Sequence, residues 1–488
     1  MKKSFKYMAV GGLVVFSLGS QVVQAAEFQP AGVRALGMGG AGVASIRDTN
    51  ASYWNPAAFG FFGEDDAAMK ASDNNGMGDK DFGISADVGA GVSLQGNLAG
   101  LVDTIGKINY GAVQTAINGN TTGTLAGQPL LDSLTLINKL DGLNAPGTGL
   151  RILANGMGGV RIKNFGMGVQ VLGEIGVSAK IDTQNLGLAA GVAGVAGVQQ
   201  AVAALPLAAT TTTYFSAAQQ AQLVGLGYTQ ATINQVGAQL AATPAAQGQQ
   251  ATIAQALNTV ANTTGSLSNN NSTIHYQGAI VTEVPLSYGY AITPNFSIGG
   301  SLKYIQAQVI DGYTGVFNQN SNNFSFSQFK ETKSGFGIDM GAMYRMPNFQ
   351  AGLVLRNLNS PKFKHSWGYV YEMKPQAKLG VSYMPWNTVT MELDADLTKN
   401  KSALRSYDTQ YINAGLEWNV FHIVALRAGA YKNMAQNDIG TVYTAGLGIN
   451  LWAARLDIGG AMSTKKSQYQ GQSFPREARV SAALNIDF

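Results

Sequence analysis

The stretch Glu477-Ala-Arg-Val-Ser-Ala-Ala-Leu-Asn-Ile-Asp-Phe488, which ends the sequence, decides the fold class. Successive side chains of a β-strand point to opposite faces, so this segment has one apolar and one polar face, with Ala483 as the exception. A soluble sheet shows the same alternation. A strand that ends on Phe is also typical of the closing strand of a bacterial outer-membrane barrel. The apolar face consists of Ala478, Val480, Ala482, Leu484, Ile486 and Phe488.

The first 25 residues have the features of an export signal. Lys2, Lys3 and Lys6 precede an apolar stretch of about eleven residues, Met8–Leu18, which is too short to span a bilayer. Val23-Gln24-Ala25 fits a small-x-small cleavage site. We expect residues 1–25 to be cleaved, and loss of the three lysines lowers the formal net charge from +4 to about +1. A basic surface for nucleic acid is therefore not supported.

Composition restricts how the chain meets a membrane. The sequence has no Cys, which excludes a lipid-modified amino terminus, disulfides and thiolate metal sites. No run of 18 or more apolar residues follows the signal, so we expect no helix to span the inner membrane. A membrane location therefore requires strands.

Alternating segments of strand length recur from residue 80 onward. With the closing strand they number fourteen, and we expect the residues before them, 26–79, to form an N-terminal plug of the barrel 80–488. The segments are 80–95, 149–162, 165–181, 275–291, 294–310, 333–346, 348–358, 373–384, 387–399, 409–419, 421–432, 440–451, 453–464 and 477–488.

Short and long connections between these segments alternate strictly. Lys163–Asn164 and Met346–Pro347 are short, whereas 96–148 and 182–274 are long. Bacterial barrels have short periplasmic turns and longer outer loops, so the order predicts an all-β, membrane-spanning antiparallel barrel in a Gram-negative outer membrane. A soluble β-sandwich explains the alternation but not this order. Aromatic residues at the short-turn ends predict an inner girdle: Tyr344, Phe349, Trp386, Trp418, Phe421, Trp452 and Phe488.

The two longest connections are expected to form helical outer loops. Residues 96–148 have apolar side chains at helical spacing. Residues 183–282 contain no Asp, Glu, Lys or Arg, and the parts 216–225, 229–242 and 247–260 have helical character. One interpretation is an amphipathic cap that meets lipid, a hydrophobic ligand or another envelope component. The other is a low-complexity, partly disordered insertion.

A glycine-rich run follows the signal. Its Gly37-x-Gly39-x-x-Gly42 spacing formally matches a dinucleotide-binding fingerprint, but no strand of a βαβ unit precedes it. Gly37, Gly39, Gly40 and Gly42 are better explained as positions where the backbone packs tightly inside a lumen. Asn55-Pro56-Ala57 predicts a tight turn that the Asn side chain caps, with direct ligand contact as the alternative.

The run Gly37–Gly42 followed by Asn55-Pro56-Ala57 resembles the plug region of the long-chain fatty-acid transporter (FadL-like) superfamily. The chain is most similar to its exported TraF-like branch, named for conjugal transfer. The resemblance covers nearly the whole mature chain except 183–272. It implies a 14-stranded barrel with the amino terminus in the lumen, passage of hydrophobic compounds in the relatives, and, by name, a role in conjugation. The strand motifs that carry it are 336–342, 393–400, 410–415, 426–430 and 444–448.

Pro285 stands well inside the predicted strand 275–291. Proline cannot donate a hydrogen bond, so a closed barrel needs a bulge or a gap at this position. The transporters that the chain resembles use a kinked wall strand as a side exit into the membrane. Two interpretations follow: an opening in the wall, or a bulge without a transport role.

The predicted inner faces carry many charges, and buried charges need partners. We expect a salt-bridged scaffold that holds the plug, with Asp457 pairing across to Arg479. A cation-selective channel is the alternative, although a plug would block it. The predicted network consists of Asp339, Arg356, Glu392, Asp394, Asp396, Arg427, Arg455, Asp457, Glu477 and Arg479.

Catalysis has little support in the sequence. His275, His365 and His422 form no Ser-His-acid grouping and no metal-ligand spacing. We therefore expect no enzyme, cofactor or metal site, with a lipid-processing barrel as a third option. The predicted function is binding or passage of hydrophobic small molecules through an outer-membrane barrel in contact with lipid. The alternative is a non-transporting component of a conjugal transfer or related envelope assembly, with envelope proteins as partners.

Overall fold

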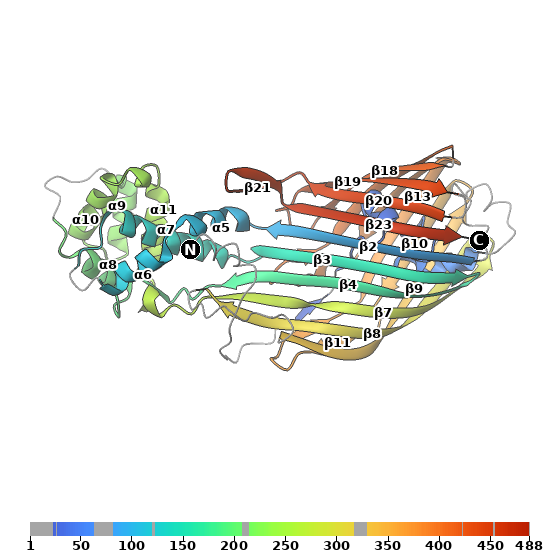
Figure 1. Cartoon of the computed structure of the whole chain (residues 1–488), viewed down its shortest axis with the longest axis horizontal. Coiled ribbons are helices and arrows are strands. Elements are labelled where there is room, and N and C mark those ends of the chain that lie inside the picture. The colour runs from blue at the N-terminus through green and yellow to red at the C-terminus, as the bar shows by residue number, and fades with distance from the viewer. Residues whose placement is uncertain are drawn as a thin grey trace.

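The computed structural model of the chain describes residues 23–25, 27–62, 82–119, 123–206, 214–316, 329–421, 423–451 and 454–487. Fourteen antiparallel strands form a closed barrel, in which β23 pairs with β2 to complete the circle (Figure 1). The fold-class prediction is confirmed, and the soluble β-sandwich is wrong. The strands of the barrel are β2 (Phe82–Gln95), β3 (Gly149–Ile162), β4 (Phe165–Lys180), β7 (Thr273–Thr293), β8 (Phe296–Gly315), β9 (Lys330–Met346), β10 (Phe349–Arg356), β13 (Gln376–Trp386), β14 (Val389–Asp396), β17 (Tyr411–Val420), β18 (Val424–Asn433), β19 (Thr441–Leu451), β20 (Ala454–Ser463) and β23 (Glu477–Asp487).

Some of the sequence-based predictions lie outside the described residues. These are most of the signal peptide (residues 1–22), the plug segment 63–79, and Trp452, Phe488 and His422.

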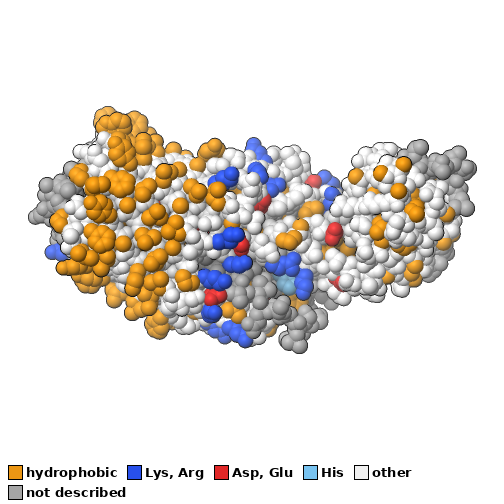
Figure 2. Space-filling view, turned by 180° about the vertical axis from the view of Figure 1, so that it is seen from behind, with side chains coloured by type: hydrophobic (Ala, Val, Ile, Leu, Met, Phe, Trp, Pro, Cys, Tyr) orange, Lys and Arg blue, Asp and Glu red, His pale blue; other side chains and the backbone are white. Residues whose placement is uncertain are grey.

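The outward face of the barrel is apolar. On β14, Met391 and Leu393 are 44% and 57% exposed, whereas the alternate residue Glu392 is buried. Figure 2 shows apolar side chains over the part of the barrel that lies away from the helices. Trp386 and Phe421, beside short turns, are 67% and 86% exposed. A face of this composition requires hydrocarbon as its solvent, so the barrel spans a membrane.

The helices of the two long connections gather at and beyond the outer end of the barrel, opposite the short turns (Figure 1). The first long connection forms α5 (Leu98–Lys107), α6 (Tyr110–Gly119) and α7 (Gly127–Leu143). The second forms α8 (Gly194–Val202), α9 (Ala217–Gly225), α10 (Gln230–Ala241) and α11 (Gln250–Ala261), flanked by the short strands β5 (Asn185–Gly187) and β6 (Gly265–Ser266). We call α6–α11 with β5 and β6 the helical head. No helix in the described ranges is long and apolar enough to cross a bilayer.

The helical head has its own hydrophobic core. Leu134 of α7, Val198 of α8 and Leu257 of α11 belong to one buried cluster. The Tyr214 hydroxyl donates to the Ala246 carbonyl at 2.7 Å, and burial raises the pKa of Tyr214 to about 12, so the hydroxyl stays a donor. The described part of the insertion is therefore folded around this core.

Smaller elements lie at the outer end of the barrel. β11 (Lys362–Lys364) and β12 (Val370–Glu372) form a hairpin, and β1 (Val23–Ala25) pairs with β12 in parallel. Cleavage after Ala25, as the sequence predicts, would remove β1 from this sheet. Two further hairpins are β15 (Asn400–Lys401) with β16 (Asp408–Thr409), and β21 (Lys466–Tyr469) with β22 (Gln472–Pro475).

The plug consists of α2 (Val33–Gly37), α3 (Ala51–Trp54) and the 3₁₀ helix η1 (Pro56–Phe61) with their connections. Its backbone meets the barrel wall where the wall has glycine. Gly415 and Gly429 pair across β17 and β18, and a Cβ on either would overlap the backbone of Met38. Plug and wall are therefore in direct backbone contact.

We predict that Gly429→Ala lowers the stability of the folded barrel by about 1–3 kcal/mol, because the new methyl group overpacks the plug contact. The control is Gly460→Ala on the outward face, where the nearest atom to an added Cβ is the Arg479 carbonyl oxygen at 3.5 Å. Thermal unfolding in detergent measures both variants. Equal unfolding temperatures for the two variants would show that the contact is looser than described.

Candidate functional site: the plugged lumen

The plug runs through the barrel from its outer end to its short-turn end. Glu27 pairs with Arg151, which stands near the outer start of β3. At the other end, the Ser297 hydroxyl, next to the short turn between β7 and β8, donates to the Ala57 carbonyl at 2.6 Å. The plug is therefore held at both ends of the lumen.

The glycine run lies against β17, β18 and β19. Gly39 and Gly40 adopt φ of +68° and +77°, the left-handed region that glycine enters without strain. Gly39 N–H donates to the Thr444 hydroxyl oxygen at 2.9 Å, and the Asn413 amide donates to the Gly39 carbonyl at 2.6 Å. The Thr444 hydroxyl donates to the Gly37 carbonyl at 2.9 Å. Wall side chains thus satisfy the plug backbone directly.

Two carboxylates of β14 hold the next four plug residues. Asp394 accepts hydrogen bonds from the N–H groups of Gly42 and Val43 at 2.9 and 3.1 Å. Glu392 accepts from the N–H groups of Ala44–Ser45 at 2.8 and 3.2 Å, and from the Ser45 hydroxyl. Four N–H groups and one hydroxyl of the plug thus donate to this strand, which makes it a major anchor of the plug.

Asn55-Pro56-Ala57 forms a capped turn that also contacts the wall. The Asn55 side-chain oxygen accepts from Ala57 N–H at 3.1 Å, and Pro56 begins η1. The Asn55 amide donates to the carbonyls of Val43 and Ala342, both at 3.2 Å. The motif thus ties two parts of the plug to β9.

A chain of ion pairs joins the plug to the wall. Arg34 of α2 contacts Glu417 at 3.1 Å, and Glu417 contacts Arg427 at 2.6 Å. Arg427 contacts Asp457 at 2.6 Å, and Asp457 contacts Arg455 at 2.7 Å. All five side chains are at most 8% exposed. Each charge has an opposite neighbour, as burial away from water requires.

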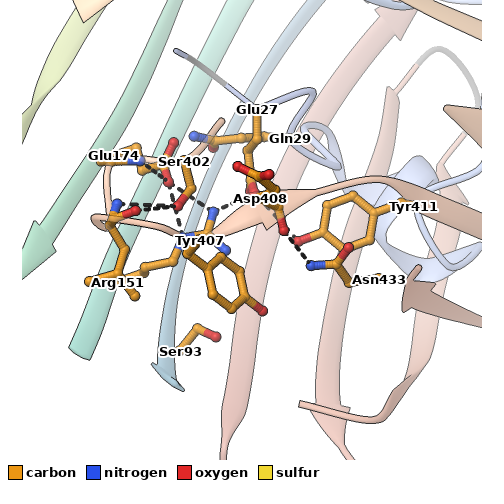
Figure 3. Close-up of polar contacts among 12 residues, drawn as sticks. Glu27, Gln29, Ser93, Arg151, Glu174, Ser402, Tyr407, Asp408, Tyr411 and Asn433 are labelled. Atoms are coloured by element: carbon orange, nitrogen blue, oxygen red, sulfur yellow. Dashed lines mark hydrogen bonds and ion pairs between the residues drawn. The ribbon is translucent and has the colours of Figure 1, made fainter. Parts of the chain in front are cut away.

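A second cluster surrounds Glu27 near the outer end (Figure 3). Glu27 pairs with Arg151 and, at 3.5 Å, with Arg479. Arg151 also contacts Glu174 at 2.9 Å, and Arg479 contacts Glu477 at 2.8 Å. One plug carboxylate therefore links strands β3 and β23.

The connection between β15 and β16 folds inward onto this cluster. Ala403 N–H donates to Glu174 at 2.9 Å. The Tyr407 ring is buried, with the Arg151 guanidinium 5.4 Å from its centroid (Figure 3). An outer loop thus helps to fill this part of the lumen above the plug.

A third cluster lies on the β7–β10 side of the wall. Lys303 contacts Glu283 at 3.2 Å and Asp339 at 2.9 Å, and Arg356 contacts Glu283 at 3.0 Å. The Arg356 guanidinium also lies 4.0 Å from the ring centroid of Tyr53 in α3. A cation–π contact therefore joins this cluster to the plug.

All ten charged residues of the predicted lumen network are buried, at no more than 6% exposed. Asp396, the one member of this network not yet described, pairs with Lys378 at 3.2 Å. The expected pair of Asp457 with Arg479 is wrong: Arg479 is opposite Ala461 on β20, four residues from Asp457, which pairs instead with Arg427 and Arg455. Arg479 is directed instead toward the plug.

Sequence reasoning missed several members of these clusters as ion-pair partners: Glu27, Arg34, Arg151, Glu174 and Glu283. The sequence did contain a signal for Arg151, Glu174 and Glu283, because each is a charged residue in a predicted strand segment with few other charges. No periodic signal marks Glu27 or Arg34, which lie in the plug.

Pro285 faces the lumen at a local interruption of strand pairing. On the β8 side the register is unbroken, and Pro285 is opposite Lys303. On the β4 side the described pairs run from Met167↔Leu286 directly to Gln170↔Glu283, with none for Gly168, Val169, Val284 or Pro285. The wall is thus paired on one side of the proline and interrupted on the other.

Comparison with known proteins identifies a family model. The family described as "F plasmid transfer operon, TraF, protein" matches residues 52–396, more than half of the chain. No curated protein matches the chain.

Several solved barrel structures are similar to the chain. The Ralstonia pickettii toluene transporter TbuX is 12% identical, with 94% of this chain and 98% of that chain covered and a TM-score of 0.44. The P. putida toluene transporter TodX is 12% identical, with 95% and 99% covered and a TM-score of 0.43. A Pseudomonas aeruginosa FadL homologue is 11% identical, with 93% and 98% covered and a TM-score of 0.44.

We predict that Glu417→Gln destabilises the protein by about 3–5 kcal/mol, because Arg34 and Arg427 lose their shared counter-charge while buried. Thermal unfolding in detergent provides the measurement. The control is Lys107→Gln, which removes an exposed pair with Asp103 and should change little. A Glu417→Gln barrel as stable as the control would exclude this chain of ion pairs as the anchor of the plug.

Proposed function

The chain belongs to the family described as F plasmid transfer operon, TraF, protein, and we propose that it is a closed outer-membrane barrel that anchors an extracellular binding head. In this proposal the protein is exported by a cleaved signal peptide. It serves a conjugal transfer or related envelope assembly and does not conduct solutes. The observation that carries the proposal is the set of buried ion pairs between plug and wall, above all Arg34 with Glu417.

The lumen is poorly suited to an apolar solute. A molecule that moved along it would have to separate ion pairs such as Glu27 with Arg151, whose side chains are fully buried. Leaving one member of such a pair unpartnered costs about 3–5 kcal/mol, and several pairs lie in series. A hollow beside Phe28, Lys378 and Tyr411 has no volume that a water molecule could enter.

The helical head is the part best placed to bind a partner. It stands beyond the barrel (Figure 1), and its core is closed by residues such as Leu240 and Val260. Its exposed residues include Gln230 and Gln247, within the uncharged range 183–282. A preformed surface loses little conformational entropy on binding, and the part of it formed by residues 183–282 carries no charge that would steer a partner over a long range. Both properties suit contact with another envelope component.

Conductance tests the closed lumen. We predict that purified full-length protein in a planar bilayer gives no steady ion current, because the plug fills the lumen. The double variant Arg34→Ala/Glu417→Ala should produce current steps as the plug loosens, whereas Lys107→Gln should stay closed. A steady current through the unaltered protein would refute the closed-barrel proposal.

Plasmid transfer between cells tests the role of the head. Gln230→Glu/Gln247→Glu places two charges on the exposed head, and we predict at least a tenfold fall in transfer frequency. The matched control is Gln468→Glu/Gln472→Glu on the exposed β21–β22 hairpin, with equal added charge. Equal transfer by both variants, at equal surface expression, would remove the head from this role.

A second candidate function is passage of hydrophobic compounds, and the interrupted pairing beside Pro285 favours it. In this alternative a compound leaves the lumen between β4 and β7. Pro285→Val supplies a backbone N–H that can close the interruption, so it should slow uptake of radiolabelled oleate by cells. Pro294→Ala, in an exposed short turn, is the control. Uptake no faster than in cells without the protein would eliminate this candidate.

A further inference from the structure

The lipid-facing wall carries an apolar groove of about 730 Å³ across β13, β14, β17, β18 and β19. Grooves of this size are in the range that holds small-molecule ligands. Most of its lining residues belong to the outward face of the barrel, so the groove opens into the hydrocarbon of the membrane. They include Tyr383, Leu393, Ala414, Ala428, Ala430 and Tyr443.

The strand register explains the shape of the groove. Leu393, Ala414, Ala430 and Tyr443 are successive partners in one row across β14, β17, β18 and β19. The two alanines form a low floor between two large side chains, which are 57% and 62% exposed. An extended apolar chain fits along such a floor and gains contact with both flanks.

Four exposed lysines stand at the outer end of the same strands. Lys432 lies two residues beyond Ala430 on β18, about 7 Å farther out. Lys399 follows β14, Lys401 lies in β15, and Lys374 precedes β13. Figure 2 shows Lys and Arg side chains collected between the apolar surface and the helical head.

These lysines carry surplus positive charge. Asp408, 22% exposed, is 3.9 Å from Lys399 and 3.4 Å from Lys401, so one carboxylate serves two cations. Among the described residues, no salt bridge reaches Lys374 or Lys432; Glu372 attracts Lys374 but already pairs with Lys362 at 3.0 Å. Uncompensated charge at the edge of hydrocarbon attracts anionic headgroups, at roughly 1 kcal/mol per lysine near the surface.

We propose that the groove and the four lysines form one binding site for a phosphorylated glycolipid of the outer leaflet. The acyl chain lies along Ala414 and Ala430, and the phosphate lies among Lys374, Lys399, Lys401 and Lys432. Because both halves of the site stand on β14 and β18, one amphipathic molecule reaches both. The site faces the membrane, so it is independent of the proposed function of the lumen and head.

Native mass spectrometry of the full-length protein in detergent tests the phosphate half, with bisphosphorylated lipid A as the probe. K374Q/K399Q/K401Q/K432Q should bind it about tenfold more weakly, from the loss of four nearby cations. K330Q/K333Q/K465Q/K466Q removes the same number of rim lysines on other strands and should change binding less than twofold. Equal weakening by both variants would overturn the proposal in favour of diffuse attraction.

The groove half has its own variant and probes. A414L/A430L fills the floor and should weaken lipid A binding about tenfold while all lysines remain. Lipid A without phosphates, with the same acyl chains, should bind about tenfold more weakly than the bisphosphorylated form. Free inorganic phosphate should not compete, since it lacks the chain. Unchanged binding to A414L/A430L, or competition by free phosphate, would refute a two-part lipid site.

Discussion

Every charge inside the barrel must have a partner, and this requirement holds the plug and the wall together. Neither water nor lipid reaches Glu417, so its charge depends on Arg34 from the plug and Arg427 from the neighbouring strand. The same dependence applies to Arg151, which lies between Glu27 of the plug and Glu174 of the wall. A barrel with these wall residues and no plug would lose the partners that Arg34 and Glu27 supply to Glu417 and Arg151.

The wall therefore separates a polar lumen from the apolar membrane. At one place, on β17 and β18, its side chains are small on both faces. Gly415 and Gly429 face inward and admit the plug backbone, while Ala414 and Ala430 face outward as the floor of the lipid-side groove. Alternation of side chains in a strand makes the two faces independent in chemistry. The two faces are nevertheless close in space, because the plug and the occupant of the groove lie on opposite sides of one sheet.

The sequence predicted most of the architecture because alternation is local. A segment such as 387–399 shows by itself that Leu393 and Asp394 face opposite sides, and strict short–long order then gives the topology. The partners of charges are not local. Arg34 meets Glu417 across 383 residues of chain, and nothing in either neighbourhood indicates this. Asp457 was assigned the wrong arginine because the sequence does not give the register between β20 and β23, which places Arg479 opposite Ala461.

The distribution of charged residues changes along the barrel axis, and it affects how the head is held relative to the membrane. Many lumen charges are paired, such as Glu417 with Arg427, and lysine charge is in surplus at the outer boundary. Residues 183–282 contain no Asp, Glu, Lys or Arg. An anionic leaflet would attract or repel a head with many charges. Because salt screens these forces, the orientation of such a head relative to the membrane would change with ionic strength. In the head, the charged residues are confined to Asp132, Lys139 and Asp141 of α7, so this coupling is weak. The position of the head is then set mainly by packing, through contacts such as those of α7 with α11 and with β4.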